Sequence, residues 1–214
     1  MTASPKVSVA PRLRHAFFAA TLLWVAAVLL GGGAETYLSR GRFLQRAASN
    51  ANASATYLWR PPRGAVKDPA PLIGKRALFV RIISHNMFVY LMLLLGVLSW
   101  GIPTVLTTAS NAWALGWMIA SAVATGVSPS IVAMVILPHG ILEITGFTVG
   151  AAVGLQGWYY GTFAMRGQLQ LTSRSVQTLL FYSGVGALIL LIAAMVESSV
   201  TLELVLLYSN NRPL

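Results

Sequence analysis

The feature that most constrains this chain is the near absence of charge after residue 81. Of its 15 Lys and Arg residues, only Arg166, Arg174 and Arg212 follow Arg81. Charged residues make up 9% of the whole chain, against roughly 25% in soluble domains. Apolar runs of roughly 20 residues are long enough to cross a bilayer as helices. The sequence therefore predicts an all-α, polytopic transmembrane bundle embedded in a lipid bilayer.

Residues that break helices divide the apolar sequence into about five predicted spans. The run 131–137 is too short to cross a membrane, and it lies between Gly126 and Pro138. Irregular backbone at membrane depth is tolerated only inside protein or beside a wet cavity, so we expect a re-entrant or half-helix segment near 127–138. The predicted spans cover residues 16–33, 82–100, 111–125, 139–159 and 179–196.

Four further segments complete the predicted domain organisation. Residues 1–15 form a basic N-terminal tail, and residues 34–77 form a basic extramembrane loop with an interfacial helix near 36–48. Residues 78–208 form the main membrane domain, and residues 209–214 form a tail. Basic segments beside membrane spans bind anionic headgroups, so we expect no nucleic-acid partner. The orientation of the chain in the membrane stays open. The positive-inside rule predicts one orientation from the basic loop and the opposite orientation from the basic N-terminal tail.

Ionisable residues are rare within the apolar sequence, and two of them are spaced for one helix face. His139 and Glu143 are four residues apart, so they point the same way from a helix. Ionisable groups at membrane depth usually face a bundle interior and carry function. We expect both residues to converge there with His85 and Glu197, whereas Glu203 lies nearer the interface.

A glycine stripe continues the helix face that carries His139 and Glu143. It comprises Gly146, Gly150 and Gly154, each four residues from the next. Small residues at this spacing allow helices to approach closely. The stripe predicts helix packing either within one chain or between two copies of a homo-oligomer.

The His and Glu residues suggest zinc chemistry, because imidazole nitrogen and carboxylate oxygen are good zinc ligands. In this hypothesis His85, His139 and one glutamate bind zinc, and the other glutamate acts as the general base, so that Glu143 and Glu197 are each candidates for both roles. The chemistry would be hydrolysis of a peptide at membrane depth. The His-Glu-x-x-His signature is absent. A structural polar network and a proton or ion path remain alternatives, and the lack of cysteine excludes thiolate ligands.

Several of these residues, taken in order, resemble a known family. The most specific element is Pro138-His139-Gly140-x-x-Glu143 with its glycine-rich continuation to Gly154. The other matching residues are His85-Asn86, Gly96, Gly101, Thr104, Asn111, Gly116 and Glu197 after Ala193-Ala194. Over roughly residues 77–208 the chain resembles the stage II sporulation protein M family of polytopic bacterial and archaeal membrane proteins.

The resemblance implies a multi-pass protein of the bacterial cytoplasmic membrane and a second possible function. The sporulation member of the family anchors a peptidoglycan-degrading complex, and related proteins accompany peptide maturation or export. The alternative to an intramembrane metallopeptidase is therefore a non-catalytic scaffold for cell-envelope or peptide-maturation proteins. A scaffold explains the fold but gives no reason for buried His and Glu, whereas an enzyme explains those groups. A scaffold would present a docking surface, which we expect on residues 34–77.

Overall fold

The computed structural model describes residues 7–8, 13–50 and 75–201, and most of these residues lie in helices. Two short strands, β1 (Val7–Ser8) and β2 (Leu169–Gln170), pair in parallel. The other elements of the described part of the chain are helical: α1 (Leu13–Asn50), α2 (Lys75–Leu95), η1 (Gly96–Leu98), α3 (Ile102–Ala124), α4 (Pro129–Gly154), α5 (Gln156–Met165), α6 (Ser173–Val196) and the π-helical turn η2 (Glu197–Thr201).

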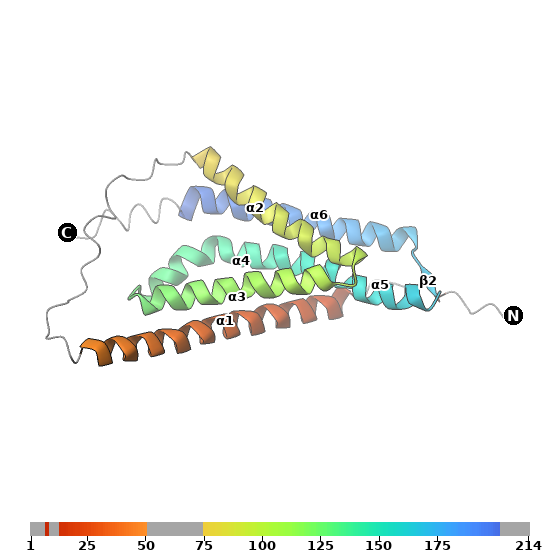
Figure 1. Cartoon of the computed structure of the whole chain (residues 1–214). Coiled ribbons are helices and arrows are strands. Elements are labelled where there is room, and N and C mark those ends of the chain that lie inside the picture. Colours follow the sequence, from red (N-terminus) through yellow and green to blue (C-terminus); the bar gives the residue numbers. More distant parts are fainter. Residues whose placement is uncertain (1–6, 9–12, 51–74, 202–214) are drawn as a thin grey trace.

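The five long helices form an elongated bundle (Figure 1). Following the chain in Figure 1, α1, α3 and α6 run in one direction, and α2 and α4 run in the other. Four helical segments are long and apolar enough to cross a membrane: Leu13–Arg40, Arg76–Leu98, Pro129–Met165 and Ser173–Ser199. Large apolar side chains such as Phe18, Leu29 and Leu180 are exposed on the outside. An outer surface of this kind suits lipid, and the prediction of an all-α, multi-pass membrane protein is confirmed.

The predicted half-helix near 127–138 is wrong. Those residues form the turn before α4 and its first part, and α4 continues as one helix through Pro138 to Gly154. Apolar helix formers surround Pro138, so the loss of one backbone N–H donor does not end the helix. His139 directly follows the proline, at a point where helices commonly bend.

The predicted first span and the predicted interfacial helix are parts of one helix. Helix α1 covers both 16–33 and 36–48 and ends at Asn50. No proline or other strong breaker separates the two segments, and the glycines Gly31, Gly32 and Gly33 lie within the helix. Residues 51–74, the rest of the predicted loop, lie outside the described residues, as do Glu203 and the C-terminal tail.

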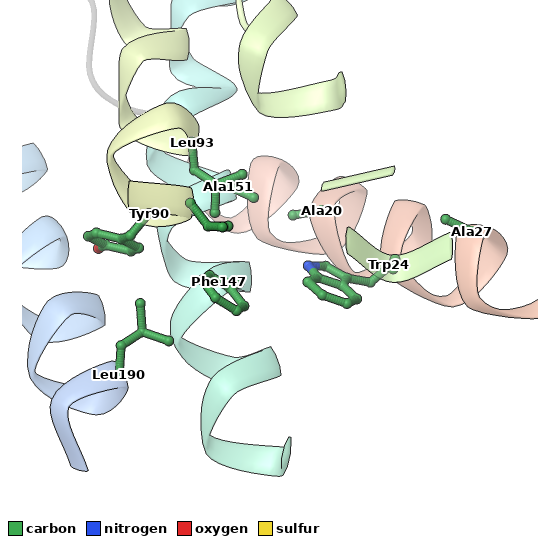
Figure 2. Packing of buried hydrophobic residues seen from close by; sticks show 10 residues of the cluster. Ala20, Trp24, Ala27, Tyr90, Leu93, Phe147, Ala151 and Leu190 are labelled. Atoms are coloured by element: carbon green, nitrogen blue, oxygen red, sulfur yellow. The ribbon is translucent and has the colours of Figure 1, made fainter. Parts of the chain in front are cut away.

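The apolar core joins the five long helices α1, α2, α3, α4 and α6 (Figure 2). The indole of Trp24 stacks on Phe147, with ring centroids 6.3 Å apart and planes inclined by 15°. Tyr90 is 2% exposed, and its hydroxyl donates a hydrogen bond to the carbonyl oxygen of Ser183 at 2.8 Å. This bond ties α2 to α6 without leaving the phenol unsatisfied in an apolar interior.

The glycine stripe of α4 packs against helices of the same chain. A Cβ atom at Gly146 would meet the side chain of Leu190, and one at Gly150 would meet the ring of Tyr90. A Cβ atom at Gly154 would overlap the carbonyl oxygen of Leu93. All three glycines are buried, so this face is occupied by α2 and α6. The suggestion that it joins two copies of the chain is therefore corrected in favour of packing within one chain.

Helices α1 and α3 also meet through glycine. A Cβ atom at Gly116 would overlap the carbonyl oxygen of Val28, and one at Gly31 would overlap that of Trp113. Because the clashing atoms belong to the backbone, a larger residue would push whole helices apart. Close approach of this kind gives α1 and α3 extensive van der Waals contact, which drives helix association in lipid.

We expect Gly116→Ala to destabilise the bundle by roughly 1–3 kcal/mol, the usual cost of overpacking a tight interior. The matched control is Gly33→Ala, because a Cβ atom there meets nothing within 4 Å. Both changes replace a helical glycine, so both gain similar helix propensity. Thermal unfolding followed by circular dichroism in detergent measures the difference. Equal stability of the two variants would contradict the proposed close contact between α1 and α3.

Candidate metal centre

A cavity of about 410 Å³ opens between the helices of the bundle. It is lined by the first half of α2, the middle of α4 and Glu197 after the end of α6, and residues of α1 and α3 complete its walls. Its apolar walls include Trp24, Leu115, Ile144 and Phe147. The polar and charged residues of its walls are Arg81, His85, Asn86, Asn111, His139, Glu143 and Glu197.

Three of these side chains converge. One possible ligand atom each from His139, Glu143 and Glu197 lies within 4.8 Å of the other two. Two ligands of one tetrahedral zinc ion, each about 2.0–2.2 Å from the metal, are about 3.3–3.6 Å apart. The three groups would therefore have to move closer together to share one ion. All three residues are partly buried.

The backbone explains how residues far apart in sequence meet. Helices α4 and α6 run antiparallel, and Gly146 contacts Leu190 across them. About two helical turns before Gly146 lies His139, and about two turns after Leu190 lies Glu197. Because the helices are antiparallel, the N-terminal direction along α4 is the C-terminal direction along α6. His139 and Glu197 therefore lie on the same side of this contact, at similar distances from it, and their side chains meet. Glu143 lies one turn from His139 on the same face of α4.

Glu197 occupies a special backbone position. It follows α6 and begins the π-helical turn η2. The wider π turn changes the direction of side chains relative to a regular α-helix, and π turns occur frequently at functional sites. Ser198, the next residue, is 5% exposed and donates a hydrogen bond to the carbonyl oxygen of Met195 at 3.2 Å.

Asn86 supports the carboxylate of Glu143. Its side-chain Nδ2 donates a hydrogen bond to Glu143 Oε1 at 2.5 Å, and Asn86 is 5% exposed. A short hydrogen bond of this kind restricts the orientation of the carboxyl group. Glu143 also offers one carboxylate oxygen to the three-residue group.

His85 lines the same cavity but does not belong to the three-residue group. It is exposed, whereas the adjacent Asn86 is buried. Consecutive residues on a helix do not share a face, so Asn86 points to Glu143 and His85 points to a different part of the wall. The structure thus brings together three of the four residues expected from the sequence.

Sequence reasoning missed the roles of Asn86 and Asn111 in this cavity. Asn111 lines it from α3, and its Nδ2 donates a hydrogen bond to the carbonyl oxygen of Thr107 at 2.9 Å. Asparagine is uncommon in an apolar helix, and this signal could have pointed to both positions. Spacing along the sequence gave no sign that Asn86 reaches a glutamate 57 residues away.

The donor set fits a divalent metal ion. One imidazole and two carboxylates can supply three ligands, and the cavity gives access for a fourth. Catalytic zinc sites have three protein ligands and one open position. Carboxylate-rich sets also suit manganese. The donor atoms therefore fit divalent transition-metal ions, and zinc and manganese are both members of this class.

Comparison with known proteins identifies the family of this chain. The chain is 27% identical over 125 residues to an uncharacterized protein of Methanocaldococcus jannaschii, an alignment that covers 58% of this chain and 70% of that protein. No solved structure matches the chain significantly. The family model of stage II sporulation protein M matches residues 15–202, which include every helix that lines the cavity. The chain therefore belongs to the stage II sporulation protein M family.

Proposed function

We propose that this protein binds a zinc ion through His139, Glu143 and Glu197 and uses it to hydrolyse peptide bonds within the membrane. The convergence of these three side chains in an accessible cavity is the observation that carries the proposal. Three ionisable groups in a membrane bundle are costly unless they are paired or bind a cation. One ion bound by all three side chains would offset the cost of placing these ionisable groups in the bundle.

Each residue of the group has a distinct role in this proposal. A divalent ion supplies Lewis acidity, which polarises a carbonyl oxygen and activates water. Asn86 holds Glu143 as a fixed ligand, and His139 is the second ligand. Glu197 would bind the ion through one carboxylate oxygen. Its other oxygen would accept a proton from the attacking water and pass it to the leaving amine nitrogen as the peptide C–N bond breaks. The stacked rings of Trp24 and Phe147 form an apolar wall that limits access of bulk water.

We further propose that α3 is a fifth membrane span. Helices α2 and α4 belong to two of the four candidate spans and run in the same direction. The chain must therefore return across the membrane between them, and α3 connects them. Its 23 residues extend about 35 Å, which is enough to cross. We place the protein in the cytoplasmic membrane of a bacterium and keep the domain limits 1–15, 16–33, 34–77, 78–208 and 209–214 as proposals.

A non-catalytic scaffold is the second candidate function, and one observation favours it. The hydrogen bond from Asn86 gives the Glu143 side chain a polar partner within the bundle, without any ion. A fully bonded polar network can specify how helices pack. In that case the protein would recruit cell-envelope or peptide-maturation proteins, and the three side chains would hold the bundle together.

Metal content separates the two functions. We expect purified wild-type protein to contain about one zinc ion per chain, and His139→Ala to lose it, because one of only three ligands is removed. His85→Ala is the matched control, since His85 lines the cavity outside the group. Elemental mass spectrometry of protein purified without chelator gives the ratio. Metal-free wild-type protein would favour the scaffold.

We expect Asn86→Ala to weaken zinc binding by roughly 10–100-fold, the usual effect of losing a residue that orients a metal ligand. Asn111→Ala serves as the control, because it removes the same side chain from the same cavity without touching a ligand. Competition with a fluorescent zinc chelator reports both affinities. Equal loss in the two variants would point to a general change in the cavity.

Hydrolysis itself is tested in proteoliposomes loaded with zinc. We expect cleavage of quenched fluorescent peptides of apolar sequence, and a fall of roughly 10²–10⁴-fold in Glu197→Gln, the usual contribution of a general base. Zinc content of the same variant shows whether the loss is chemical or a loss of metal. Stoichiometric zinc with no cleavage of any peptide in a broad library would argue against a peptidase.

A further inference from the structure

Arg81 contributes a positive charge to the wall of the metal cavity. It lies on α2, one turn before His85 and on the same side of the helix. Its side chain is exposed, which places it toward the open side of the cavity. An anion that enters the cavity can therefore reach the guanidinium.

Arg81 is the one Lys or Arg among the described wall residues. A divalent ion held by Glu143 and Glu197 would neutralise their two negative charges, because metal ligands bind in their deprotonated forms. Arg81 would then give the metal-loaded cavity a single positive charge. A monoanion is therefore favoured in the metal-loaded cavity.

The other residues that line the cavity indicate what the rest of the bound anion should be like. Trp24, Leu115, Ile144 and Phe147 form an apolar surface beside the charged groups. A volume of about 410 Å³ lies in the lower part of the range of small-ligand sites, so it suits one or two amino-acid residues better than a two-chain phospholipid. Arginine binds a planar carboxylate through two parallel hydrogen bonds.

We propose that Arg81 binds the terminal carboxylate of a peptide whose last residue is apolar, while the metal centre faces the bond to be cleaved. This inference rests on the proposed function and assigns its substrate class. The site would remove residues from the free carboxyl end of a peptide and would exclude internal sites of a long chain. Arg81 acts as a specificity-determining residue and takes no part in proton transfer.

Binding of small probes tests this assignment without any peptide bond. The probes are 3-phenylpropionate, its neutral amide 3-phenylpropanamide, and 2-phenylethylphosphonate, measured by calorimetry on zinc-loaded and zinc-free protein in detergent. We expect zinc-loaded protein to bind the carboxylate at least about tenfold more tightly than the amide, since hydrogen bonds to charged groups are the stronger ones. The preference should disappear in Arg81→Gln.

The control variant is Arg76→Gln, which removes an exposed arginine of α2 that does not line the cavity. It should keep the preference for the carboxylate.

An unchanged preference in Arg81→Gln would show that the carboxylate binds only to the metal and would overturn the inference. Phosphonate binding that is tighter than carboxylate binding and loses this advantage in Arg81→Gln would overturn the peptide assignment in favour of a lipid phosphate. Absence of zinc from wild-type protein would overturn this inference and the proposed function together, whereas zinc without a carboxylate preference would overturn this inference alone.

Discussion

The close contact between α4 and α6 determines where the polar groups of this bundle meet. Gly146 has no side chain, so Leu190 of α6 packs directly on the backbone of α4. In lipid, where the hydrophobic effect does not drive helices together, such packing contributes much of the association. The contact also fixes the relative height of the two antiparallel helices, and that height sets Glu197 beside His139 and Glu143. The same glycine stripe therefore serves stability and site geometry.

Much of the fold could be predicted from sequence because the membrane restricts the choices. Long apolar runs with few charges indicate helical spans, and four of the described helices have that character. The four-residue spacing of His139 and Glu143 also predicted their shared face correctly. The half-helix was wrong because Pro138 was treated as a strong break, whereas a proline within an apolar helix commonly bends the helix without ending it.

The rest of the site depends on contacts between distant segments. Glu197 joins the group through the packing of α6 on α4, and Asn86 through the packing of α2 on α4. Periodicity within one helix contains no information about the relative height of two helices. His85 was grouped with the others on residue type alone. The rotation of α2 instead directs its neighbour Asn86 to Glu143, which no local pattern in the sequence indicates.

In the proposed centre, three side chains from two helical segments coordinate one ion. X-ray absorption at the zinc edge of the purified, metal-loaded protein measures the ligand shell directly. We expect one nitrogen and about three oxygen neighbours at roughly 2.0–2.2 Å, with one oxygen supplied by water, and loss of this shell in Glu197→Ala. A shell rich in nitrogen, or one that is unchanged in Glu197→Ala, would contradict the proposed centre.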